Sequence, residues 1–332
     1  MGSIRIAWIS IAIGLSLLST ASSAGQKQNP TKETIEAPKS GTTDFKVTLL
    51  GTGTHGPRPD RFGASTLVEA GPEKLVFDCG RSCTTRLWQV GIPLGAVKLF
   101  ITHLHADHTV GIPDLWLTGW LPMPYGGRKE RFRVWGPKGT REMMSDIEKA
   151  YRANTQTPRS FTLSQSQVGI DAREFTEGVV YEENGVRVTA FKVRHGEIDA
   201  FGFRVDYKGR SVVISGDMSP NENFIKYAHG ADLLIHEVAA ANPELLEKSE
   251  VVRRIQANHC TPEEAGRNFA RIKPMLAIYT HFALFSGEGI PEVTIPEIIA
   301  RTRTTYSGPL EAGEDLMTIF IGDMVSVKRY TH

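Results

Sequence analysis

Short apolar runs alternate with polar, glycine-containing turns from Phe45 onward. A run of four to eight apolar residues bounded by turn residues predicts a buried strand. On this basis we expect strands at residues 45–50, 65–69, 74–77, 97–102, 131–135, 186–193, 202–206, 211–215, 233–236, 276–280 and 317–321. Apolar residues at helical spacing predict helices at residues 84–90, 109–120, 140–152, 223–228, 261–272 and 295–302. Strands in runs and pairs with helices between them predict an α+β fold, with sheets covered by helices on their outer faces.

The first 43 residues lack this pattern. Arg5 precedes an uncharged apolar run over residues 6–18, and small residues follow as far as Ala24. These are the three parts of a secretory signal, so we expect cleavage near Ala24 and a periplasmic or secreted protein with no membrane span afterwards. Residues 25–43 are polar and predict a flexible linker. The expected organisation is a signal peptide at 1–24, a linker at 25–43 and one domain at 44–332.

The charge composition bears on the partners of the protein. The 332 residues carry a formal net charge of +1, and neither half contains a basic block. Electrostatic binding of nucleic acid depends on clustered lysine and arginine, so we expect no strong nucleic-acid binding. Of the three cysteines, Cys79 and Cys83 are close enough to pair across a turn but could equally remain free thiols, and Cys260 is expected to be unpaired.

Three histidines and an aspartate lie within six positions at the end of the apolar run 97–102, namely His103, His105, Asp107 and His108. His103 and His105 are two residues apart at a strand tip and point the same way, so both imidazoles can bind one metal ion. Asp107 and His108 follow a reversal of the chain, which suits a second metal ion beside the first. Burying so many ionisable groups costs several kcal/mol unless cations compensate.

Three further candidate ligands follow apolar strands downstream. His195, Asp217 and His281 each lie just past such a strand, where loops bring distant residues together. An aspartate can bridge two cations through its two oxygens, which makes Asp217 the expected shared ligand.

Together these segments resemble the metallo-β-lactamase superfamily. The resemblance rests on Thr102-His-Leu-His-Ala-Asp-His108, His195, Ser215-Gly-Asp217 and Thr280-His-Phe282. Within the superfamily the chain is most similar to the ribonuclease Z branch, through the segments 49–54, 77–80, 233–237 and 258–265. That branch contains tRNA-processing nucleases and also hydrolases of small esters, including arylsulfatases and cyclic-nucleotide phosphodiesterases. The resemblance implies a four-layer αββα sandwich of two mixed sheets flanked by helices.

The resemblance also implies a dinuclear zinc site. It assigns His103, His105 and His195 to one zinc ion, Asp107, His108 and His281 to the other, and Asp217 to both. Mn²⁺ or Fe²⁺ would also accept these ligands. Asp78 would brace the histidine loop, or it is a plain turn aspartate.

The same resemblance implies an ester-cleaving mechanism. A hydroxide shared by the metal ions would attack the ester, which gives Asp107 a catalytic as well as a ligand role. His259, oriented and kept cationic by Glu237, is the candidate acid for the leaving group. The alternative for His259 is hydrogen bonding at the start of the helix that Thr261 caps.

The substrate is inferred from what is missing. The tRNA-processing members carry a long basic arm, commonly between the third histidine and the bridging aspartate, whereas here residues 201–210 form a plain hairpin. Residues 114–125 could wall a pocket for an aryl or nucleoside group, or Trp116 and Trp120 simply pack as a helix face. Residues 140–159 are interpreted as a solvated helix rather than a lid.

We therefore expect an exported dinuclear zinc hydrolase that acts on a small-molecule ester, either a phosphodiester or an aryl sulfate. The alternatives are a ribonuclease Z-type endoribonuclease for tRNA 3′ processing, a lactonase or β-lactamase-like hydrolase, and a non-catalytic binding protein on the same fold. The resemblance leaves a homodimer open.

Overall fold

The structure is a computed structural model that describes residues 44–157 and 167–331. The predicted signal peptide at 1–24 and linker at 25–43 lie outside the described residues, so both remain predictions. None of the described helices is both long enough and apolar enough to span a membrane.

The first sheet has eight strands and is mixed. Its neighbouring strands, in spatial order, are β15 (Val325–Lys328), β14 (Thr318–Ile321), β1 (Phe45–Gly51), β2 (Ser65–Ala70), β3 (Glu73–Phe77), β4 (Lys98–Phe100), β5 (Phe132–Gly136) and β6 (Ile170–Glu174). The strands from β15 to β3 pair antiparallel, and those from β3 to β6 pair parallel. The parallel strands β3 and β4 therefore end on the same side, where the histidine-rich loop begins.

The second sheet has seven strands and is also mixed. In spatial order these are β13 (Leu310–Ala312), β12 (Leu276–Leu284), β11 (Leu233–Ala240), β10 (Arg210–Ile214), β9 (Ile198–Tyr207), β8 (Val186–His195) and β7 (Gly178–Glu183). Strands β10, β11 and β12 are parallel, and β7 to β10 form an antiparallel meander.

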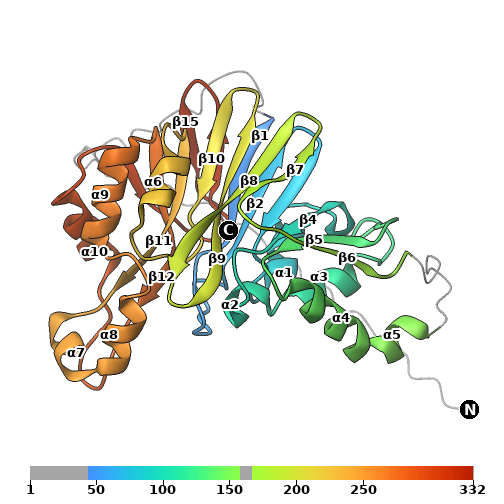
Figure 1. Ribbon diagram of the computed structural model, residues 1–332, viewed down its shortest axis with the longest axis horizontal. Helices are drawn as coiled ribbons and strands as arrows, with labels where there is room; N and C mark the ends of the chain where they lie inside the picture. Colours follow the sequence, from blue (N-terminus) through green and yellow to red (C-terminus); the bar gives the residue numbers. More distant parts are fainter. Residues whose placement is uncertain (1–43, 158–166, 332) are drawn as a thin grey trace, which may run out of the picture. The chain divides into compact units, whose positions relative to one another are not determined.

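Helices cover the outer face of each sheet (Figure 1). Beside the first sheet lie α1 (Cys83–Gln89), η1 (Leu94–Ala96), α2 (Ala106–Thr109), α3 (Ile112–Thr118), α4 (Thr140–Ala150) and α5 (Arg152–Gln156). Beside the second lie α6 (Glu222–Ala228), α9 (Pro262–Ile272) and α10 (Ile295–Arg303), and the short pair α7 (Pro243–Lys248) and α8 (Glu250–Gln256) follows β11.

Three apolar cores correspond to the three interfaces between these layers. Phe77, Phe100 and Phe203 pack between the two sheets, with Phe77 and Phe203 ring centroids 5.1 Å apart. Phe269 belongs to the core under the helices of the second sheet, and Trp116 to the core under those of the first. The four-layer αββα sandwich is therefore confirmed.

Several elements differ from the sequence-based expectation. Strands β6, β7, β13 and β15 and helices α7 and α8 were not expected. β6 reads Ile-Asp-Ala-Arg-Glu and lies at the edge of its sheet, where solvent tolerates polar side chains. The expected helix at 109–120 is the shorter α3 at Ile112–Thr118, and the separate one-turn helix α2 at Ala106–Thr109 precedes it.

The alternatives left open by the sequence are also resolved. Cys79 and Cys83 form a disulfide with Cα atoms 5.3 Å apart, and Cys260 is a buried free cysteine. Trp116, on α3, and Trp120, just past its end, are buried and meet edge to face at 5.1 Å, so they pack into the core under the helices of the first sheet. Residues 201–210 do form a plain hairpin between β9 and β10.

Candidate metal centre

The loop after β4 is held by an aspartate that follows β3. Asp78 adopts a left-handed backbone conformation with φ of 61°. Its Oδ1 accepts a hydrogen bond from the Thr102 amide, and its Oδ2 accepts one from the Thr102 hydroxyl, each at 2.8 Å. The same Oδ2 lies 2.8 Å from Nδ1 of His108. Asp78 thus braces the histidine-rich loop, as the resemblance implied.

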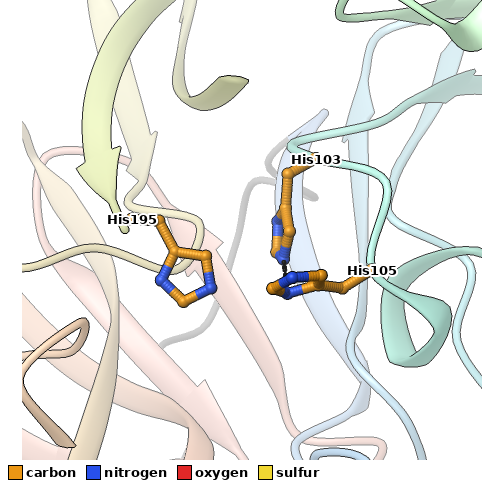
Figure 2. Close-up of side chains that lie close together, drawn as sticks. All are labelled: His103, His105 and His195. Carbon is orange, nitrogen blue, oxygen red and sulfur yellow. Dashed lines mark hydrogen bonds between the residues drawn. The ribbon is translucent and has the colours of Figure 1, made fainter. Parts of the chain in front are cut away.

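The first group of donors comprises His103, His105 and His195. Their ligand atoms all lie within 4.8 Å of one another. Figure 2 shows His195 facing the other two imidazoles, with His103 Nε2 and His105 Nδ1 3.0 Å apart. His195 is the last residue of β8, and its Nδ1 lies 2.9 Å from the carbonyl oxygen of Asn258, which leaves Nε2 free to face the group.

The second group of donors comprises Asp107, His108 and His281, again within 4.8 Å. Asp107 and His108 lie in the one-turn helix α2, as expected for residues after a chain reversal. His281 Nε2 lies 3.2 Å from both Asp107 Oδ2 and His108 Nε2.

His281 reaches the site through a bulge in the sheet. We expected it just past the end of a strand, but β12 continues to Leu284. The pairing of β11 with β12 shifts between Glu237 and Val238, opposite Thr280 and Phe282, so His281 has no partner in the ladder. Its φ of 44° is uncommon for a residue with a side chain. Bulges re-aim side chains and are frequent beside active sites.

Asp217 lies at the centre of both groups. Its Oδ2 is 3.9 Å from Nε2 of His103 and 3.8 Å from Nε2 of His195 in the first group. It is 3.4 Å from Nε2 of His108 and 3.3 Å from Nε2 of His281 in the second. The position depends on Gly216, since a Cβ there would lie 2.7 Å from the carbonyl oxygen of Phe201. One carboxylate oxygen therefore faces imidazole nitrogens from both groups, so Asp217 lies between them.

The chemistry of these donors fits metal ions. Burial, together with the neighbouring imidazoles, lowers the pKa of His103, His105 and His195, so these side chains are held neutral, as metal-bound histidines must be. In the second group, burial would lower the pKa of His108, but the charges of Asp217 and Asp78 outweigh it and raise the pKa well above its usual value, so this imidazole favours a positive charge. Its Nδ1 lies 2.8 Å from Asp78 Oδ2, and its Nε2 faces His281 and Asp217. Lone pairs and carboxylates that converge in a buried site require cations between them.

A histidine and a glutamate adjoin the donors. His259 Nδ1 lies 3.3 Å from Glu237 Oε2, within ion-pair distance but without the alignment of a hydrogen bond. Glu237 Oε1 accepts a hydrogen bond from the Cys260 amide at 2.8 Å. Burial alone would lower the pKa of His259, but the charge of Glu237 outweighs it and raises the pKa to about 9.

His259 also lies close to the start of helix α9. Two residues on, Thr261 caps α9 in a reciprocal capping box with Glu264. The imidazole nevertheless faces the donors, with its ring centroid 4.8 Å from that of His195. His259 therefore contacts Glu237 and also lies next to the start of α9.

One side chain at the site was missed by sequence reasoning. His55 lies in the turn Gly51-Thr-Gly-Thr-His-Gly56 after β1, where no site residue was predicted. Its Nε2 is 3.1 Å from Asp107 Oδ1, and the side chain is largely exposed. A histidine between the glycines of a turn that follows a strand was the available signal.

Comparisons with known proteins agree with this geometry. The profile of the beta-lactamase superfamily domain matches residues 74–282. A ribonuclease Z of Mycobacterium bovis is 31% identical over 284 residues, which cover 82% of this chain and 96% of the relative. This chain belongs to the metallo-β-lactamase superfamily.

Solved structures of the superfamily share the fold. The metallo-β-lactamase fold protein YhfI from Bacillus subtilis superposes with a TM-score of 0.65 at 19% identity, and covers 82% of this chain and 98% of its own. The short form of human tRNase Z superposes with a TM-score of 0.60 at 26% identity, over 82% of this chain and 98% of its own.

Two expectations are wrong in light of these relatives. This protein was expected to be an exported hydrolase of small phosphodiester or aryl sulfate esters. It was also expected to show no strong nucleic-acid binding. Its relatives over nearly their whole length are instead named ribonuclease Z, which supports a nuclease with a nucleic-acid substrate. The error came from two observations: a net charge of +1 without a basic block, and a missing arm at 196–216. Neither excludes phosphate contacts from other elements.

Proposed function

We propose that this protein is a metal-dependent endoribonuclease of the ribonuclease Z type that processes the 3′ side of precursor tRNA. The match to ribonuclease Z over 96% of the relative's length is the observation that carries the proposal. The named relatives include the human tRNase Z, which has the same fold.

The metal site proposed here has two zinc ions. His103, His105 and His195 would hold one, Asp107, His108 and His281 the other, and Asp217 would bind both. Bound zinc would lower the pKa of a water molecule towards neutrality and take up negative charge on a phosphate. Asp78 orients His108 through its Nδ1, so the ligand that faces the site is Nε2.

The remaining groups can deliver a proton. Cleavage of a phosphodiester leaves an alkoxide, which needs a proton as the P–O bond breaks. His259 is cationic at neutral pH because Glu237 raises its pKa to about 9, and it lies beside the donors of the first group. His259 is therefore the proposed general acid, and Glu237 is the residue that positions and charges it.

A precursor tRNA with a 3′ extension tests the proposal directly. The zinc-loaded protein is expected to cut it at one position near the 3′ end of the mature sequence, mapped by sequencing both products. A chelator should abolish the cut and added zinc should restore it. Asp217→Asn should be inactive, whereas Asp199→Asn, which changes an exposed aspartate on β9, should cut normally. An intact precursor after incubation with zinc-loaded wild-type protein would contradict the proposal.

A further inference from the structure

A groove of about 640 Å³ lies between α4 and the edge of the first sheet. Its lining comes from α4, from β6 and from the chain entering β5, and it includes four arginines: Arg131, Arg133, Arg141 and Arg173. A neighbouring hollow of about 320 Å³ shares Arg131 and adds Lys149 and Arg152. The name α4 groove is used below for the two together.

The α4 groove is lined by three acidic side chains, Glu130, Glu148 and Asp171, and the last two form ion pairs. Glu148 accepts a hydrogen bond from the Ile170 amide at 2.6 Å and lies 3.6 Å from Arg131. Asp171 accepts a hydrogen bond from Arg173 at 2.8 Å. The contacts of Glu148 tie α4 to β6. Arg133 and Lys149 are paired as well, with Glu183 and Asp146.

Two arginines of the α4 groove have no such partner. Arg141 and Arg152 are exposed, and neither forms an ion pair within the part of the chain that the structure describes. They are eleven residues apart, with Arg141 in the first turn of α4 and Arg152 at the start of α5.

One end of the α4 groove adjoins the metal centre. Gly139, just before α4, has a φ of 97°, and a Cβ there would lie 3.1 Å from Cδ1 of Leu104. Leu104 is the residue between the donors His103 and His105. Glu174 of β6 fixes this end, because its Oε1 accepts hydrogen bonds from the amides of Gly139 at 2.9 Å and Arg141 at 3.1 Å. Arg141 thus marks the near end of the groove and Arg152 the far end.

We propose that the α4 groove binds the phosphate backbone of the RNA substrate and leads it to the metal centre. The inference rests on the proposed function. It identifies where this chain, which has a plain hairpin at 201–210 in place of an arm, contacts the RNA away from the cleaved bond. Arginine guanidinium groups bind phosphate through paired hydrogen bonds, and Arg133 and Arg173 are kept in place against Trp135, at 5.0 and 5.3 Å from the ring centroid.

The test compares three variants with the wild-type protein on a precursor tRNA with a 3′ extension. The first is the double variant Arg141→Ala/Arg152→Ala. The matched control is Arg267→Ala on α9, in the opposite helical layer, which removes an exposed arginine that also has no ion pair among the described residues. The third, Asp217→Asn, reports loss of the metal centre. Metal content and thermal melting are measured for each, since the double variant should retain both.

The double variant is expected to lower kcat/KM roughly 10-fold at moderate salt. It should also reduce the slope of log kcat/KM against log salt by about 1 for each lost phosphate contact, while the control changes neither. A double variant indistinguishable from Arg267→Ala would overturn the inference and leave the proposed function standing. Failure of the wild-type protein to cut the precursor would remove the proposed function itself.

A second ligand class is tested in parallel. β6 is an edge strand, and edge strands can pair with an extended peptide. If a poly-glutamate peptide binds the wild-type protein, loses binding in the double variant, and tRNA cleavage is unaffected in that variant, the α4 groove is a protein site and the inference is wrong.

Discussion

Replacing Glu237 by glutamine removes the negative charge that faces His259 and keeps the size of the side chain. Glu237 Oε1 accepts hydrogen bonds from the amides of Cys260 at 2.8 Å and Met218 at 3.4 Å, and a glutamine oxygen can accept both. The charge on Oε2, 3.3 Å from His259 Nδ1, is what the variant loses. The variant therefore separates the electrostatic role of Glu237 from its structural role.

The magnitude follows from the pKa of His259. Burial is the largest influence and lowers it, and the charge of Glu237 raises it from 6.5 to about 9. That rise favours the charged form by about 3 kcal/mol. Without the charge, burial leaves the pKa of His259 below 6.5, so the protonated fraction near pH 7.5 falls from nearly all to under about one-tenth.

The sign of the pH dependence follows. A general acid works while it is protonated, so activity is present below its pKa and is lost as pH rises through it. For the wild-type protein we expect kcat/KM on precursor tRNA to decline as pH rises through about 9. For Glu237→Gln the decline should begin at least about 2 pH units lower, with activity near pH 7.5 reduced roughly 10-fold or more.

The assay is kcat/KM against pH, between about pH 6 and pH 10, for four proteins. His259→Ala should lose about 10²- to 10⁴-fold and show no alkaline decline of this origin. Glu263→Gln is the control, because it neutralises a carboxylate on α9 that pairs with Arg301, away from the donors. If Glu237→Gln shows the wild-type alkaline decline at an unchanged pH, Glu237 does not set the charge of His259 and the assignment of the acid is wrong.

Four further predictions concern the metal ligands, the core and the chain start. Asp217→Asn should purify with less than the wild-type metal content, measured by elemental analysis, because its Oδ2 faces donors of both groups; unchanged stoichiometry would argue against a bridging role. Asp78→Asn should weaken metal retention about 10- to 100-fold in a chelator competition, because Asp78 orients His108. Phe100→Ala should lower the free energy of unfolding by about 3–5 kcal/mol in a denaturant titration, since this ring is fully buried between the sheets; a loss below about 1 kcal/mol would contradict that packing. The mature protein recovered from cells should begin at Gly25 by N-terminal sequencing, and an intact Met1 would rule out cleavage of the predicted leader.

Much of the fold was predictable because most of its strands are buried. The runs that form β1, β3, β10 and β11 are apolar and bounded by turns, which is the pattern a covered strand imposes. The edge strands β6 (Ile-Asp-Ala-Arg-Glu) and β7 (Gly-Val-Val-Tyr-Glu-Glu) contain charged side chains and only short apolar stretches, so they give no such signal. Helices α7 and α8 are too short to show a recognisable helical periodicity of apolar residues.

The donors in the metal loop could be predicted from their local spacing, whereas the way in which His281 reaches the site could not. Spacing within residues 102–108 already places four donors together, because a short turn limits where they can point. His281 was expected past a strand end, but a bulge in β12 aims it into the site. A bulge arises from the pairing of two strands, here β11 and β12, so it cannot be predicted from the sequence of either strand alone.

The sequence by itself determined the chemistry of this protein: which side chains can bind metal, and which apolar runs must be covered. Only the tertiary structure decided the distances, because one oxygen of Asp217 meets imidazoles from three distant segments through contacts between two sheets. The tertiary structure also decided where the positively charged side chains cluster, since the α4 groove is built from arginines on three separate elements. Net charge counts such residues without regard to position, and a phosphate backbone responds to where they lie.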